Sequence, residues 1–172
     1  MKKVIILFLL ASTFSFAQKN KKEKSETEPY VVAVDNLTQK AAFELVNKAN
    51  QFAATLDKKV SIAILDAGGN TVLLVKGDGV GPHNTEASRR KAYTSLSTKT
   101  PTLELLRNAE KNSDAKNLNS LPELLLLSGG SPIYYKGNVI GSIGVSGGGG
   151  PENDDLIAKA ASLPEMGITT IK

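Results

Sequence analysis

The chain has 172 residues, a formal charge of +4 and no cysteine. Without cysteine it has no disulfide framework, and a single histidine cannot assemble a usual zinc site. The positive charge gathers at the start, because residues 1–28 hold six lysines and three glutamates, which leaves +1 for residues 29–172. A nucleic-acid binder needs a basic face on its folded domain, so this balance argues against a nucleic-acid partner.

Residues 1–17 have the pattern of a cleavable secretory signal. Lys2 and Lys3 give a positive start, residues 4–10 are apolar, and small residues stand two apart at Ser15 and Ala17. The apolar run is too short to span a bilayer as a helix. No later apolar run is long enough to span one. We therefore expect a periplasmic or secreted protein with no membrane insertion after the signal is cleaved.

Residues 18–28 are predicted to be a disordered tether. Seven of these eleven residues are charged and none is a large apolar residue, so the segment cannot bury enough surface to offset the entropy of ordering. The remaining residues, 29–172, have the length of one ordinary domain. The expected organisation is a signal, a tether and a single domain.

The first part of the domain predicts a helix followed by a β-hairpin. Apolar residues recur every three or four positions over residues 37–56, which indicates an amphipathic helix that Asp35 or Asn36 can cap. Residues 60–65 and 71–76 have strand composition and are separated by a short glycine-rich turn. This pattern predicts an antiparallel pair.

The second part of the domain predicts three helices and three strands. Pro101 separates the first two of these helices, because proline stops a helix but is tolerated in the first turn of the next. Lys136-Gly137-Asn138 indicates the turn of a second hairpin. The predicted helices cover residues 84–98, 102–111 and 151–163, the strands cover 124–127, 133–135 and 139–146, and a polar loop covers 112–120.

These elements together predict an α+β fold with a five-stranded antiparallel sheet flanked by helices. Sequential hairpins require antiparallel pairing, which excludes a doubly wound parallel sheet.

Four consecutive glycines, residues 147–150, lie between the last predicted strand and the last helix. Glycine permits unusual backbone angles, and free N–H groups at a helix start can hold a carboxylate or phosphate. No Gly-Lys-Ser/Thr follows, so this is not a nucleotide P-loop. The acids of the next turn repel an anion and favour the helix through its dipole. Two interpretations remain open: a flexible connector, or a ligand site formed by Gly147, Gly148 and Gly149.

His83, the single histidine, lies in a predicted loop just before a helix. It is either a polar loop residue or an axial ligand to haem, a role for which one side chain suffices. Tyr93, Tyr134 and Tyr135 can bind iron, stack on a flat ligand or belong to the core. No Gly-x-Ser-x-Gly motif occurs and no catalytic set of residues emerges, so an enzymatic activity is neither predicted nor excluded.

Three segments resemble the GlcG/HbpS-like haem-binding (haem-degrading domain) family, in the same order and spacing. They are Val-Ser-Ile-Ala-Ile-Leu-Asp-Ala-Gly-Gly-Asn at 60–70, Arg-Lys-Ala-Tyr-Thr at 90–94 and Gly-Ser-Ile-Gly-Val-Ser-Gly-Gly at 141–148. The resemblance spans residues 37–161. It implies a profilin-like sheet flanked by helices, homo-oligomers and, for some members, binding of haem or a corrinoid. Exported members act as haem-responsive accessory proteins.

The chain departs from the family at two iron-binding positions. Some haem-binding members carry an acid-x-x-acid motif on the helix after the second strand, where this chain has Glu86-Ala-Ser-Arg89. Some members use a threonine shortly before the third strand, where Pro122-Glu123-Leu124 offers no hydroxyl. Neither site is carried over whole, so the ligands of this chain stay open.

The first functional hypothesis is an exported accessory protein that binds, stores or senses haem or another tetrapyrrole. It places His83 or Tyr93 on the iron and Arg90, with its neighbours Arg89 and Lys91, near the propionates. The first alternative is a small-metabolite enzyme whose glycine-rich loop holds a carboxylate. The second is a ligand-free oligomeric interaction module of the same fold.

Overall fold

The computed structural model of the chain describes residues 30 and 32–172. The predicted signal (1–17) and tether (18–28) lie outside the described residues. Ala33–Lys172 forms one compact unit. Within the described part of the chain, every helix is too short or too polar to cross a bilayer.

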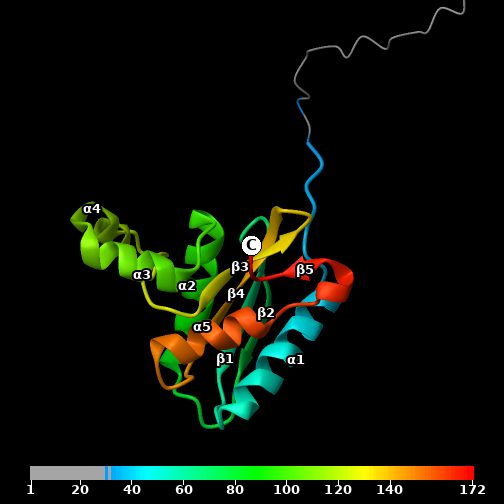
Figure 1. Cartoon of the computed structure of the whole chain (residues 1–172), viewed down its shortest axis with the longest axis horizontal. Coiled ribbons are helices and arrows are strands. Elements are labelled where there is room, and N and C mark those ends of the chain that lie inside the picture. Colours follow the sequence, from blue (N-terminus) through cyan, green and yellow to red (C-terminus); the bar gives the residue numbers. More distant parts are fainter. Residues whose placement is uncertain (1–29, 31) are drawn as a thin grey trace, which may run out of the picture. The chain divides into compact units, whose positions relative to one another are not determined.

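A five-stranded sheet forms the centre of this unit, and each strand is antiparallel to its neighbours (Figure 1). The spatial order is β2-β1-β4-β3-β5, so β1 and β4 lie in the middle. The strands are β1 (Ser61–Asp66), β2 (Thr71–Lys76), β3 (Gly130–Tyr135), β4 (Asn138–Ser146) and β5 (Ile168–Thr169).

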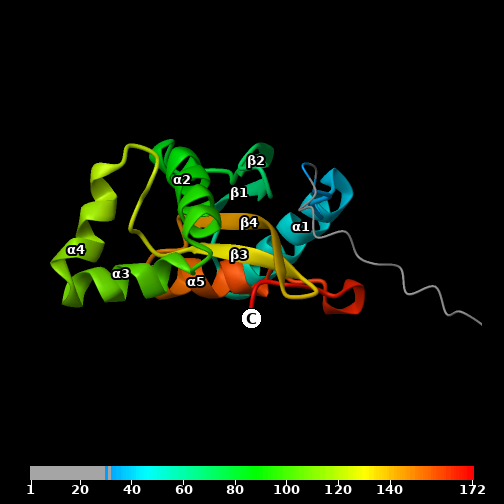
Figure 2. The same ribbon diagram turned by 90° about the horizontal axis from the view of Figure 1, so that it is seen from above.

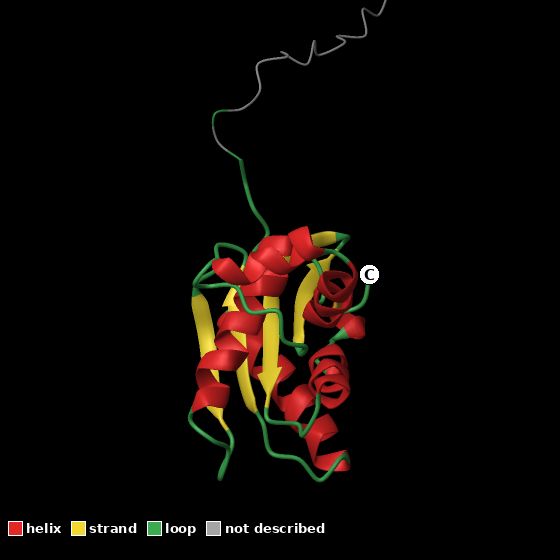
Figure 3. Ribbon diagram, turned by 90° about the vertical axis from the view of Figure 1, so that its left-hand side faces the viewer, coloured by secondary structure: helices red, strands yellow, loops and turns green. Residues whose placement is uncertain are grey.

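The helices cover both faces of the sheet: α2 lies on one face, and α1 and α5 lie on the other (Figure 2). The short α4 follows α3 at one side of the sheet, and Figure 3 shows the strands with helices in front of them and behind them. The helices are α1 (Gln39–Thr55), α2 (His83–Thr98), α3 (Thr102–Lys111), α4 (Ser113–Lys116) and α5 (Pro151–Ala160), with 3-10 turns η1 (Asn117–Ser120) and η2 (Pro164–Met166).

The main core lies between the sheet and the α1–α5 layer. Ile62 and Ile64 of β1 point into it, whereas Ala63 and Leu65 point toward α2, as the alternation of a strand requires. All four side chains are fully buried. A strand covered on both faces has no solvent side, which explains why β1 is almost continuously apolar.

On the other face, α2 lies against the backbone of the sheet itself. A Cβ atom at Gly144 of β4 would overlap the carbonyl oxygen of Ser88, and one at Gly130 of β3 would overlap that of Lys91. These two glycines therefore let the helix approach closely. The close approach fixes which side chains of α2 face the sheet and which face its edges.

The predicted fold class is confirmed: the protein is α+β with a five-stranded antiparallel sheet, and both hairpins form. The predicted strand over residues 124–127 is wrong, and the fifth strand is β5 instead. The backbone of this leucine-rich segment bonds to side chains: Arg90 Nη2 donates to the Leu124 oxygen (2.6 Å), and Leu125 N donates to Thr94 Oγ1 (2.8 Å). These bonds hold the segment against α2 and outside the sheet.

Two local predictions about helices are also wrong. The predicted polar loop over 112–120 contains α4 and η1, because the Asn112 side chain accepts a hydrogen bond from Asp114 N (2.9 Å) and so caps α4. The cap of α1 is Thr38. The amide oxygen of Asn36 instead accepts from Ala67 N (2.8 Å), which ties the segment before α1 to the β1–β2 turn.

Candidate functional site

Three of the site residues predicted from the sequence, His83, Arg90 and Tyr93, lie at different positions along α2. His83 is the first residue of the helix and is exposed, whereas Tyr93 is half-buried ten residues later. Ten residues correspond to about 15 Å along a helix axis. Arg90 points toward the segment before β3, where it bonds to Leu124. His83 is therefore too far from Tyr93 to share a site with it, whereas Arg90 lies one turn from Tyr93 and directs its guanidinium to the Leu124 oxygen.

Tyr93 lines a surface cavity of about 350 Å³ between the end of α2 and the β1–β2 turn, which we call the Tyr93 cleft. A cavity of this size lies in the range of small-molecule sites. Its walls combine apolar side chains with the Tyr93 phenol, the Ser97 hydroxyl and the Lys99 ammonium group. The lining residues are Val34, Ala67, Gly68, Gly69, Tyr93, Leu96, Ser97, Lys99 and Val139.

The β1–β2 turn is held rigidly beside Tyr93. Asp66 Oδ1 accepts hydrogen bonds from Gly68 N (2.9 Å) and Asn70 N (2.8 Å). Burial alone would raise the pKa of Asp66, but these bonds and those of the Asn70 side chain outweigh burial and hold the pKa below its ordinary value. Gly69 has φ +84°, and a Cβ there would touch the Tyr93 ring, so the ring lies directly on the turn.

The groups of the Tyr93 cleft suit a flat, apolar ligand that carries a negative charge. In the described part of the chain no hydrogen bond occupies the Tyr93 hydroxyl, and Lys99 forms no salt bridge. Leu96 and Val139 supply apolar surface beside them. A phenol can ligate haem iron, and an ammonium group can pair with a carboxylate. The residues present therefore fit a haem group.

Lys91 lies at the centre of a buried polar cluster on the sheet side of α2. Its Nζ donates to Asp154 Oδ2 (2.8 Å), the Val145 oxygen (3.0 Å) and Ser146 Oγ (3.2 Å). Burial lowers the pKa of Lys91, and the Asp154 carboxylate opposes that change. All three N–H groups of the ammonium have acceptors within the protein, so they are not free for a bound propionate.

The cluster continues into the glycine-rich turn and to the start of α2. Asp154 Oδ1 accepts from Gly148 N (2.7 Å), and Ser146 Oγ donates to Asn84 Oδ1 (2.8 Å). We call Asn84, Lys91, Ser146 and Asp154 the Lys91 network. It joins α2, the end of β4 and the start of α5. The Gly148 N–H binds the Asp154 carboxylate of the protein itself. Gly147 and Gly149 are the parts of the predicted anion site without that internal contact.

The Glu86-x-x-Arg89 position of α2 forms ion pairs. Arg89 Nη2 lies 2.7 Å from Glu86 Oε1 and 2.8 Å from Glu123 Oε2. A guanidinium between two carboxylates neutralises the charge that would attract iron. The described residues contain no group of three or more His, Cys, Asp and Glu side chains that could hold a metal ion.

Sequence reasoning missed Lys99 in the cleft and Asn84, Ser146 and Asp154 in the network. The sequence places Asp154 among the acids that favour the last helix through its dipole, and Asn84, Lys99 and Ser146 have no local pattern around them. The position of Asp154, six residues after Gly148, is a signal that can be read from the sequence. An acid just after a glycine-rich turn can reach back to the N–H groups of that turn. The contacts of Lys99 depend on the folded sheet and have no local signal.

The family model "Haem degrading protein HbpS-like" matches residues 37–162. The chain belongs to this family. A crystal structure of HbpS is 34% identical, with a TM-score of 0.71, and covers 77% of this chain and 92% of HbpS. Protein GlcG of Escherichia coli K12 is 31% identical over 112 residues, which is 64% of this chain and 81% of GlcG. The family resemblance seen in the sequence is thereby confirmed.

A crystal structure of a PduOC–heme complex shares the fold. It is 24% identical, with a TM-score of 0.70, and covers 80% of this HbpS-like chain and 99% of the PduOC chain. At this identity the likeness shows the fold alone. The profilin-like arrangement expected from the resemblance agrees with the sheet and helices of these neighbours.

Proposed function

We propose that this HbpS-like chain binds haem in the Tyr93 cleft. Membership of a haem-degrading family supports the ligand, and a PduOC structure of the same fold was solved with heme. The observation that carries the choice of site is the open cavity of about 350 Å³ beside the Tyr93 hydroxyl. A tetrapyrrole needs a cleft with apolar surface for its ring, one iron ligand and a partner for its carboxylates.

Each residue of the cleft has a separate role in this proposal. The Tyr93 phenol oxygen ligates the iron, Lys99 pairs with a propionate, and Leu96 and Val139 pack against the macrocycle. The hydrogen-bonded β1–β2 turn keeps Tyr93 in place. Haem, once bound, supplies a redox-active iron centre, while the chain's own residues bind and orient it.

We also propose that the protein forms homo-oligomers, with haem held between subunits. The Tyr93 cleft is open on one side, so a second subunit would cover the other face of a bound macrocycle. The mass of the protein with and without hemin, measured by light scattering, tests this point. A protein that stays monomeric in both conditions contradicts it.

Titration of hemin into the purified protein, followed by its Soret absorption, tests the proposed site. We expect a saturable Soret shift for the wild type, and an altered band with about tenfold weaker binding for Tyr93→Phe, which keeps the ring and removes only the ligating oxygen. His83→Ala is the matched control, since His83 lies at the other end of α2. The proposal fails if no Soret shift occurs, or if His83→Ala changes the spectrum and Tyr93→Phe does not.

Export of the protein is a separate proposal that depends on residues 1–17. N-terminal sequencing of protein recovered from the periplasm or the medium should begin at Gln18. Protein that stays in the cytoplasm with Met1 intact contradicts it.

A further inference from the structure

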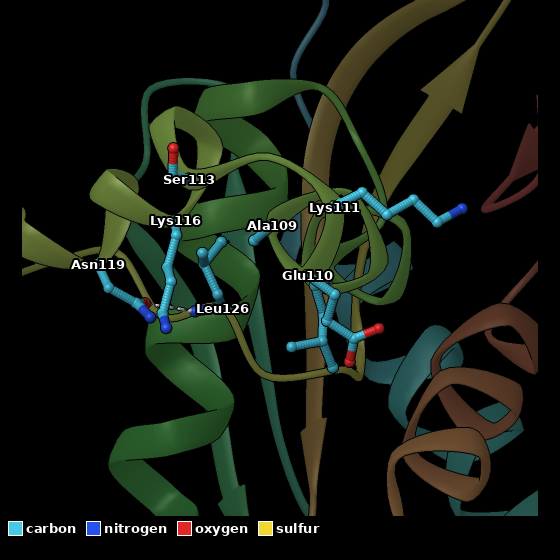
Figure 4. Close-up of a pocket in the computed structure, with 8 residues that line it drawn as sticks. Ala109, Glu110, Lys111, Ser113, Lys116, Asn119 and Leu126 are labelled. Atoms are coloured by element: carbon cyan, nitrogen blue, oxygen red, sulfur yellow. Dashed lines mark hydrogen bonds between the residues drawn. The ribbon is translucent and has the colours of Figure 1, made fainter.

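A second cavity, of about 550 Å³, lies apart from the Tyr93 cleft, between α3 and the α4–η1 segment (Figure 4). We call it the arm cavity. Neither the family resemblance nor the proposed haem site uses it. The lining residues are Leu106, Ala109, Glu110, Lys111, Ser113, Lys116, Asn119 and Leu126.

The floor of the arm cavity is apolar and largely formed by buried residues. Ala109 of α3 is 8% exposed and Leu126 is 4% exposed, and Leu106 is half-buried beside them. Ala109 is small, so much of the space above it stays open, where a leucine would fill it. Leu126 is held in place because its N–H donates to Asn119 Oδ1 (3.1 Å).

One end of the cavity carries two hydrogen-bond donors. Because Asn119 Oδ1 accepts from Leu126 N, its Nδ2 amide remains as a donor. Figure 4 shows the Lys116 ammonium next to this amide, whereas Glu110 lies at the opposite side and Lys111 points away from the cavity. Among the described residues, no salt bridge or hydrogen bond engages Lys116 Nζ or Asn119 Nδ2.

We propose that the arm cavity binds an aliphatic monocarboxylate. Its carboxylate accepts hydrogen bonds from Lys116 and Asn119, and its chain lies on Leu106, Ala109 and Leu126. A single ammonium group at one end, with the Glu110 carboxylate at the other, favours one negative charge over several. Haem does not suit the cavity, because no phenol, imidazole or thioether lines it.

Calorimetric titration of octanoate into the full chain tests the proposal, and octanamide serves as the uncharged ligand of equal length. We expect saturable one-to-one binding of octanoate, and about tenfold weaker binding of octanamide. The same loss is expected for Lys116→Gln, which removes the charge from an exposed residue. Ala109→Leu should abolish binding by filling the cavity. Lys48→Gln is the matched control and should bind as the wild type does, because Lys48 is an exposed residue of α1 that does not line the cavity.

Two results would overturn the proposal, and the Tyr93→Phe variant separates it from haem binding. It fails if octanoate gives no saturable binding, or if Lys116→Gln and the wild type bind it equally well. Circular dichroism checks that each variant is folded; if Ala109→Leu is not, Lys116→Gln decides. Tyr93→Phe should leave octanoate binding unchanged, and a loss there would place octanoate in the Tyr93 cleft and contradict the arm cavity as its site.

Discussion

Lys91 is 3% exposed although it carries a charge, and its partner Asp154 is 7% exposed. Removing one member of a buried ion pair leaves the other charge without compensation. We expect Lys91→Met to lower the free energy of unfolding by about 3 kcal/mol or more. Urea denaturation measures the change.

The matched control is Lys59→Met, since Lys59 and Asp78 form an exposed pair at 3.9 Å, and its effect should stay within about 0.5 kcal/mol. Equal effects of the two variants would contradict the structural role of the Lys91 network.

Asp66 makes the stability of the protein depend on pH in the acid range. Its pKa is held below the ordinary value of 3.8 in the folded protein, so the unfolded chain takes up a proton first as the pH falls. The stabilisation is complete above that ordinary value and is lost as the pH falls through the folded pKa. Asp66→Asn keeps the acceptor oxygen but does not titrate, so its unfolding free energy should fall less steeply between about pH 5 and about pH 3. Denaturation curves at several pH values measure this, and parallel slopes would contradict it.

At the scale of secondary-structure elements, the packing of α2 on the sheet depends on Gly144. A Cβ there would overlap the Ser88 carbonyl, so Gly144→Ala has to push the helix away from β4. We expect a loss of about 3 kcal/mol in unfolding free energy, together with changed amide chemical shifts along α2. Gly150→Ala is the control, because no atom lies within 4 Å of an added Cβ and its φ of 172° suits any residue. A Gly144→Ala protein as stable as this control would contradict the close packing.

At the scale of the whole molecule, residues 33–172 contain the complete sheet and the buried core. A chain that begins at residue 29 should therefore melt within about 2 °C of the longer chain. A chain that ends at Gly167 is the contrasting case, because it loses β5 and Thr170, which is 1% exposed and donates to the Lys159 oxygen (2.6 Å). That chain should melt about 5 °C or more lower. Thermal circular dichroism measures the melting temperatures of the three chains. Equal melting temperatures would contradict the expectation that residues 168–172 stabilise the fold and residues 1–28 do not.

Predictions from the sequence succeeded where the structural signal is local. The β1–β2 hairpin was predictable because two runs of strand residues flank a glycine-rich turn, and the side of α1 that packs was predictable from its apolar spacing. The run Leu124–Leu127 has the composition of a strand but forms none. Its composition shows that it is partly buried, whereas pairing depends on whether another strand is near enough to receive its N–H groups.

The sequence by itself determined the family and the α+β class, and it supplied Tyr93 and four successive glycines as candidates for binding. Only the tertiary structure decided which of these residues share a site. His83, Arg90 and Tyr93 stand on one helix, but His83 lies about 15 Å along its axis from Tyr93 and Arg90 bonds to the Leu124 oxygen. Gly69 meets Tyr93 only once the first hairpin packs beside that helix. Helical periodicity shows which residues share a face, while the neighbours of that face come from parts of the chain far away in sequence.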